Sequence, residues 1–194
     1  MKKKEAILRV ATVMFANKGF ADTSGQELAR LTGVAEGTIF YHYKSKEGLL
    51  LAILEKTRDE IVDQIERFFE NRPFSNGLEM TEEVVAFYLY LAGLMEDHFQ
   101  LLHRHFVYKF SESNPEIRRS LESIYNWLVD VFERAITVGQ EDGSINPDIH
   151  PRKSALILFT MVDGLVRFKN HNLYDAGALF NELIETCRRM LRVI

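Results

Sequence analysis

The sequence predicts an all-α protein of about nine helices, and three observations lead to this prediction. Apolar residues recur at helical spacing along nearly the whole chain, as Ala11, Met14 and Phe15 do. No segment keeps the alternation of apolar and polar residues that indicates a β-strand. Helix start and stop signals separate the apolar stretches. We therefore expect helices throughout and no sheet.

The first two helices are bounded by clear signals. The first is expected to end in "NKGF", where Gly19 is a natural stop after a C-terminal turn. Ser24 and Glu27 form a capping box that begins the second helix, and Gly33 ends it. A third short helix is predicted over residues 36–43.

A long helix begins at Lys46 and continues to about residue 71. Pro115 favours the start of another helix, because proline suits the first turn. The loop-forming stretch "EDGSINPDIHP" separates the later helices. The remaining helices are expected at about 79–93, 94–110, 115–139, 152–171 and 175–192.

Two short helices that are joined by a glycine turn and pack on a longer preceding helix form a helix-turn-helix. Ile39 and Tyr43 lie four residues apart and are expected to face inward. This leaves Phe40 and Tyr41 outside, which is unfavourable on a surface that meets only water. Rings can pack on thymine methyl groups, and hydroxyl, imidazole and ammonium groups can bind phosphates. The pattern predicts a DNA-binding surface.

Charge is distributed unevenly along the chain. The net charge is −4, but residues 1–50 hold eight basic and five acidic side chains, a net charge of +3. The remaining 16 basic and 23 acidic groups give residues 51–194 a net charge of −7. A positive N-terminal part on an acidic body favours an anionic partner for the N-terminal part.

Residues 5–54 resemble the DNA-binding domain of the TetR family of bacterial transcriptional repressors. The matching stretches are "AILRVATVMFANKGFADTS", "ELARLTGVAEGTIFYHYKSKEGLL" and "AILE". The resemblance implies a helix-turn-helix DNA-binding domain at 1–47 and a helical effector-binding and dimerisation domain at 48–194. It also implies that residues 36–43 form the recognition helix. The residues expected to contact DNA are Gln26, Glu36, Gly37, Thr38, Phe40, Tyr41, His42, Lys44 and Lys46.

Three residues depart from the family pattern. Ala35 stands where a capping Ser or Thr is common, and Gly25 where an apolar residue usually packs. Glu36 is acidic where a base is frequent; it either accepts a hydrogen bond from a cytosine amino group or interacts with the helix dipole. These departures leave an alternative open, in which the chain is a ligand-binding or protein-interaction module whose helix-turn-helix no longer recognises specific DNA.

Aromatic residues are concentrated between residues 84 and 132. They either fill a core or line a largely apolar cavity that has a few hydrogen-bonding points. The resemblance implies an effector pocket among the middle helices, for a small apolar or aromatic molecule. Asp163 either forms a hydrogen bond within the protein or holds a ligand cation. The predicted effector-binding residues are His98, Phe99, Leu102, Phe106, Trp127, Leu128 and Phe159.

The last two helices are amphipathic, and the resemblance implies that they pair with their copies in a homodimer. A twofold dimer places two DNA-binding domains on a palindromic operator. The residues expected at the dimer interface are Leu156, Val166, Leu179, Leu183, Ile184 and Leu191.

Neither enzymatic nor membrane function is expected. His98 and His105 share a helix face, but no nearby carboxylate or thiol completes a metal site, and no cofactor is predicted. The longest apolar run, residues 84–95, is too short to span a bilayer. The single cysteine, Cys187, is typical of a reducing compartment. We therefore predict a cytoplasmic transcriptional repressor that is released by its effector.

Overall fold

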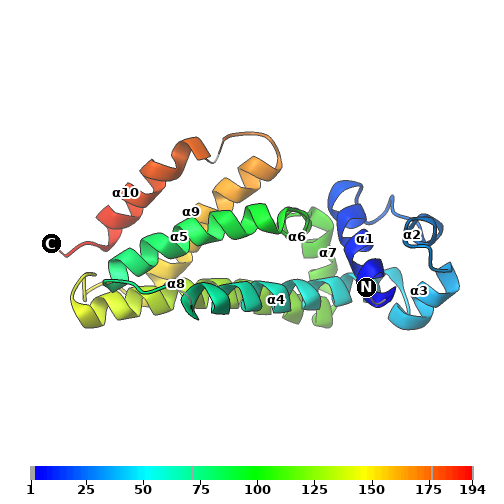
Figure 1. Cartoon of the computed structure of the whole chain (residues 1–194), viewed down its shortest axis with the longest axis horizontal. Helices are drawn as coiled ribbons and strands as arrows, with labels where there is room; N and C mark the ends of the chain where they lie inside the picture. The colour runs from blue at the N-terminus through cyan, green and yellow to red at the C-terminus, as the bar shows by residue number, and fades with distance from the viewer. Residues whose placement is uncertain (1–2, 71, 176, 194) are drawn as a thin grey trace. The chain divides into compact units, whose positions relative to one another are not determined.

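The computed structural model describes residues 3–70, 72–175 and 177–193. These residues form ten α-helices and one short 3-10 helix, with no β-strand among them (Figure 1). The predicted all-α class is confirmed.

The chain packs as two compact units. In described residues, the first contains 3–61 and 95–124, and the second contains 62–94 and 125–193. Two long helices, α4 (Lys46–Glu70) and α8 (Pro115–Asp142), contribute residues to both units. This division reflects packing, so the predicted functional boundary after residue 47 stays a prediction.

The first unit contains the predicted helix-turn-helix, formed by α1 (Lys3–Asn17), α2 (Gly25–Thr32) and α3 (Glu36–Tyr43). The capping box begins α2 as expected, because the Ser24 hydroxyl accepts a hydrogen bond from the Glu27 N–H at 3.1 Å. Gly33 ends α2 in the left-handed conformation, with φ of 67°. The side chains buried in this part of the unit include Ile7, Phe15, Leu28, Ile39, Leu49 and Leu50.

One helix expected at 94–110 is two helices, α6 (Glu96–Leu102) and α7 (His105–Ser113). The break lies at Arg104, which has extended backbone angles. Its guanidinium donates hydrogen bonds to the carbonyl of Ala16 at 2.6 Å and to that of Asn17 at 3.0 Å. These are the last carbonyls of α1, which have no partner within their own helix. Arg104 therefore caps α1 and joins it to the α6–α7 corner.

The second unit contains α5 (Gly77–Leu94), α9 (Pro151–Asn170), the 3-10 helix η1 (Gly177–Leu179) and α10 (Phe180–Leu191), together with parts of α4 and α8. The start of α5 contacts the α8 backbone at Gly139 so closely that a β-carbon on Gly77 would overlap it. The Gly77 N–H also donates to the Asp142 carboxylate at 2.6 Å. Since only glycine permits this approach, Gly77 fixes where α5 begins.

The last predicted helix, at 175–192, is shorter than expected, since α10 begins at Phe180 after η1. Its buried face includes Cys187, where burial, with the nearby Glu82 carboxylate, raises the pKa of the thiol to about 11. In the described parts of the chain, no helix has both the length and the apolar character needed to cross a membrane.

Replacing Arg104 with alanine should lower the free energy of unfolding by about 1–3 kcal/mol, because two charge-assisted hydrogen bonds are lost and α1 loses its cap. Urea denaturation measures this change. Arg118→Ala is the matched control, because Arg118 is exposed and its ion-pair partner among the described residues is Glu122, one turn away on α8. Equal effects of the two substitutions would contradict the capping role.

Candidate functional site

The outer face of α3 is exposed in part as the sequence predicts, with Phe40 and Glu36 as exceptions. Ile39 is fully buried, whereas Gly37, Thr38 and His42 are exposed and Tyr41 has 74% of its surface accessible. Tyr43 is half-buried, and its hydroxyl donates to the carbonyl of Lys4 at 3.3 Å. Burial raises the pKa of this hydroxyl. The face therefore presents a ring, a hydroxyl and an imidazole to solvent.

Phe40 and Glu36 are only half-exposed, because their side chains lie against Gly25 at the start of α2. A β-carbon on Gly25 would come within 2.6 Å of the Phe40 ring and within 2.9 Å of the Glu36 carboxyl carbon. The missing apolar residue at position 25 is thus replaced by Phe40 and Glu36 from α3. The Glu36 carboxylate lies at the N-terminus of α2, where the helix dipole favours a negative charge.

The chain reverses sharply between α3 and α4 at Lys44. Lys44 has φ of 66° and ψ of −46°, and the Ser45 N–H donates to the Tyr43 carbonyl at 2.8 Å, which is the hydrogen bond of a γ-turn. The Lys44 ammonium lies 5.4 Å from the centre of the Tyr41 ring. Lys44 and Tyr41 therefore form one exposed, positively charged corner beside α3.

Lys46 is more constrained than the sequence suggests. Its ammonium donates to the Thr23 carbonyl at 2.9 Å and lies 4.5 Å from the centre of the Phe20 ring. The side chain thus anchors the loop between α1 and α2, a role that the sequence does not reveal. Gln26, the predicted contact on α2, is exposed.

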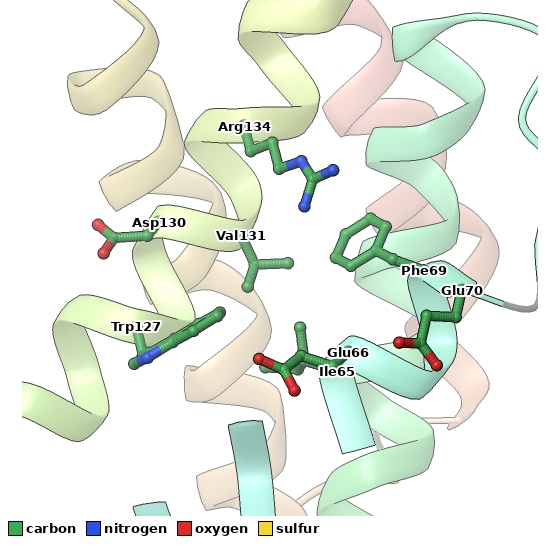
Figure 2. Close-up of a pocket in the computed structure, with 8 residues that line it drawn as sticks. All are labelled: Ile65, Glu66, Phe69, Glu70, Trp127, Asp130, Val131 and Arg134. Atoms are coloured by element: carbon green, nitrogen blue, oxygen red, sulfur yellow. The ribbon is translucent and has the colours of Figure 1, made fainter. Parts of the chain in front are cut away.

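A cleft of about 700 Å³ lies in the second unit between α4 and α8 (Figure 2). Ligand sites in proteins typically have volumes of about 300–1,000 Å³. Of the seven residues predicted to bind an effector, only Trp127 lines this cleft. The lining residues are Ile65, Glu66, Phe69, Glu70, Trp127, Asp130, Val131 and Arg134.

Two of the charged groups around this cleft are engaged by other groups. Asp130 is ion-paired with Arg152, and this contact is the largest cause of a raised pKa at Arg152. The Arg134 guanidinium lies 4.9 Å from the centre of the Phe69 ring. Figure 2 shows the Glu66 carboxylate turned toward the Trp127 ring. Within the described ranges, neither Glu66 nor Glu70 has an ion-pair partner.

The other six predicted effector residues lie elsewhere. Four of them, His98, Phe99, Leu102 and Phe106, belong to the first unit. The Phe106 ring packs 5.6 Å from that of Phe20, between their centres, and burial lowers the pKa of His98. These residues support the helix-turn-helix and do not line the α4–α8 cleft.

Leu128 and Phe159 belong to the second unit, where Leu128 is buried and Phe159 is half-buried. The Phe159 ring contacts those of Tyr88 and Tyr125, with centres 5.9 and 5.8 Å apart. The Tyr88 hydroxyl donates to Asp163 at 2.7 Å, so Asp163 joins α9 to α5 through a hydrogen bond.

A second groove, of about 600 Å³, lies between α4 and α5 in the same unit. Phe68 and Phe87 stack in it, with ring centres 4.2 Å apart, and Arg72 pairs with Glu83 at 2.7 Å. The C-terminal part of α4 therefore lines a groove on each of two sides.

Three of the six predicted dimer residues, Val166, Leu183 and Leu191, are buried within the chain itself. They pack α9 and α10 into the second unit, and so are not available at the surface of the single chain. Leu156 and Leu179 are exposed, and Ile184 is half-buried. The exposed apolar residues of α9 also include Ile157 and Phe168, which the sequence analysis did not select.

A helix-turn-helix with an exposed, ring-rich second helix, joined to a helical body that has a ligand-sized cleft, defines a DNA-binding regulator. Residues 7–53 match the family model described as "Bacterial regulatory proteins, tetR family". The helix-turn-helix segment of the chain therefore matches this family, and the curated relatives that it resembles are described as regulators.

Similarity to individual proteins extends over nearly the whole chain. The Fatty acid metabolism regulator protein of Bacillus subtilis is 24% identical over 187 residues, which cover 92% of this chain and 90% of the relative. A putative transcriptional regulator from Saccharomonospora viridis, solved in complex with choline, has a TM-score of 0.87 at 21% identity and 98% coverage of both chains. FadR of Bacillus subtilis, solved in complex with stearoyl-CoA, has a TM-score of 0.76 at 21% identity, covering 94% of this chain and 96% of its own.

Replacing Gly25 with alanine should displace the Phe40 and Glu36 side chains, because the new methyl group would overlap both. We expect about a tenfold loss of affinity for cognate DNA, equivalent to about 1.4 kcal/mol, and a smaller loss for scrambled DNA. Fluorescence anisotropy with the two duplexes measures this difference. Equal losses on both duplexes would contradict a role for the Gly25 contact in base recognition.

Proposed function

We propose that the chain is a homodimeric repressor that binds a palindromic operator through residues 36–43 and is released by a small, largely apolar effector. The observation that carries this proposal is the exposed face of α3, in a chain whose helix-turn-helix belongs to a family of bacterial regulators. A repressor of this kind acts on DNA in the cytoplasm.

The α3 residues divide into two groups by their environment. Thr38, Tyr41 and His42 are exposed and polar, which suits contacts with the phosphate backbone. Glu36 and Phe40 are held against α2, so their positions are fixed before DNA binds. A prearranged side chain loses little conformational entropy on binding, which favours it for reading base edges. Exposed Gly37 between them permits close approach of a DNA strand.

The three departures from the family pattern do not favour the alternative, in which the helix-turn-helix no longer recognises specific DNA. Phe40 and Glu36 occupy the space left by Gly25, so this contact between α2 and α3 is filled. Ala35 gives α3 no side-chain cap, but Glu36 supplies a negative charge in its first turn.

The proposed dimer uses the exposed side of α9 and the start of α10. Leu156, Ile157 and Phe168 on α9 are 45%, 52% and 41% exposed, and Leu179 before α10 is 42% exposed. Such apolar surface on a regulator favours association with a second copy. A twofold dimer presents two α3 helices to half-sites about 34–36 Å apart.

The proposed effector site is the α4–α8 cleft, because α4 is common to the cleft and to the helix-turn-helix unit. Two residues separate the start of this helix from the end of α3, and its C-terminal end lines the cleft. A ligand that binds one orientation of α4 more tightly than another shifts the population of DNA-binding states. Choline and stearoyl-CoA, named in the complexes of the two structural neighbours, both combine an apolar part with a charged group.

Selection of bound duplexes from a random DNA library tests the proposal. We expect enrichment of a palindrome whose half-sites are about one helical turn apart, as a twofold dimer requires. Retention of unrelated sequences alone would contradict specific DNA recognition and support the alternative module.

Replacing Lys44 with glutamine should weaken binding to all duplexes about equally and reduce the slope of log K against log salt by about one unit, as the loss of one phosphate contact does. Binding titrations at several salt concentrations measure the slope. Glu141→Gln is a useful control, because Glu141 is exposed on the C-terminal turn of α8. An unchanged slope for the Lys44 variant would remove Lys44 from the DNA contacts.

Replacing both Leu156 and Ile157 with glutamate should convert the dimer to a monomer, because paired copies would bury four unpartnered carboxylates. Light scattering measures the mass, and circular dichroism shows whether the monomer keeps its helices. Leu183→Glu is the comparison variant. It should unfold the chain and not merely separate the dimer, because Leu183 is buried within the chain. A dimer formed by the double variant would place the interface elsewhere.

A further inference from the structure

We infer that the α4–α8 cleft binds an organic cation, a positively charged head group of the quaternary ammonium type carried on an apolar body. The inference rests on the proposed function, because it names the chemical class of the effector at the proposed site. It is argued from the charges, the rings and the space of the cleft.

The α4 side of the cleft carries two exposed carboxylates, and Arg134 of α8 is the cation among the lining residues. Glu66 and Glu70 lie four residues apart on α4, so their side chains are neighbours on one face. Like charges at this spacing repel each other. Both lie at the C-terminal end of α4, where the helix dipole is also negative. In the part of the chain that the structure describes, no cation pairs with either carboxylate. A bound cation would relieve both unfavourable interactions.

The α8 side adds aromatic surface beside these carboxylates. Trp127 lines the cleft from α8, and Phe69 lines it from α4 (Figure 2). The faces of such rings attract cations, with tryptophan the most favourable. The protein already uses this interaction within the cleft, since Arg134 lies 4.9 Å from the centre of the Phe69 ring. The Trp127 ring is the second aromatic surface there, and the Glu66 carboxylate is turned toward it.

The apolar lining and the volume define the rest of the ligand. Ile65 and Val131 are buried residues that contribute to the cleft wall. A space of about 700 Å³ is much larger than a metal ion needs and suits a molecule with an apolar body. A carboxylate or phosphate head group would be repelled by Glu66 and Glu70. An anion would suit the α4–α5 groove better than the α4–α8 cleft, because Arg67 and Arg72 line that groove.

Calorimetry with the full-length protein and two probes tests the inference, decyltrimethylammonium as the cation and decanoate as the anion, both below micelle-forming concentrations. We expect saturable binding of the cation, with at least tenfold weaker binding of decanoate. The double substitution Glu66→Gln and Glu70→Gln should weaken cation binding about five- to tenfold. Glu141→Gln removes one negative charge from α8 outside the cleft and should leave the affinity unchanged.

A second pair of variants isolates the aromatic contribution. Trp127→Leu should weaken cation binding several-fold, and Trp127→Phe should restore most of it, because a phenyl ring keeps a face for the cation. Thermal unfolding of each variant without ligand verifies that the fold is intact. Equal affinity of the wild-type protein for both probes, or unchanged cation binding by the glutamine double variant, would overturn the inference.

The same probes separate this inference from the proposed function when they are added to the DNA complex. Cation binding that follows the variants as expected but does not release DNA supports the cation site and contradicts the proposed release mechanism. Release of DNA by decanoate, without measurable binding of decyltrimethylammonium, supports effector-controlled DNA binding and overturns the cation site.

Discussion

The continuity of α4 is the constraint on which the functional account depends. Its first turn follows the γ-turn at Lys44 directly, so the start of α4 is tied to the end of α3. Ser45 fixes this start, because its hydroxyl accepts a hydrogen bond from the Gly48 N–H at 3.0 Å. The last turn of the same helix supplies Glu66, Phe69 and Glu70 to the cleft. A helix transmits a displacement along its axis more readily than a loop. In the proposed switch, α4 therefore connects the effector cleft to the DNA-binding helix α3.

The helix-turn-helix is held by contacts that involve charged side chains as well as apolar packing. Arg104 caps α1 from the α6–α7 corner, and Asn17 at the end of α1 donates to Asp97 at 2.9 Å. Lys46 bonds to the loop that precedes α2. Interactions of this kind have specific geometry, so a change in α1 or α4 alters a few definable hydrogen bonds. The proposed regulatory switch would act on these hydrogen bonds.

Much of the fold could be predicted from the sequence because its signals are local. The Ser24–Glu27 capping box and Gly33 fixed the ends of α2, and the burial of Ile39 followed from helical periodicity. The break at Arg104 could not be predicted, since its extended backbone is stabilised by carbonyls of Ala16 and Asn17, far away in the sequence. Lys46 is a similar case, because its carbonyl partner, Thr23, precedes it by 23 residues.

The proposed ligand and dimer sites were harder to predict, for related physical reasons. Aromatic residues serve equally well in a core and in a cleft, so ring content alone did not separate Phe106, which packs near Phe20, from Trp127. The spacing of Glu66 and Glu70 was a usable signal, because two like charges four residues apart are unfavourable without a partner. On α9, apolar residues occur on both the buried and the exposed sides, so periodicity did not identify the surface available to a second copy.

The most direct test of the coupling through α4 is a distance measurement between the two copies in the dimer. Glu47→Cys places a spin label on the exposed first turn of α4, and the buried Cys187, whose thiol pKa is about 11, should not react. Double electron–electron resonance then gives the distribution of distances between the two spin labels in the dimer bound to its operator. The account predicts that saturating decyltrimethylammonium changes this distribution as DNA is released. An identical distribution, with the cation bound in the cleft, would contradict it.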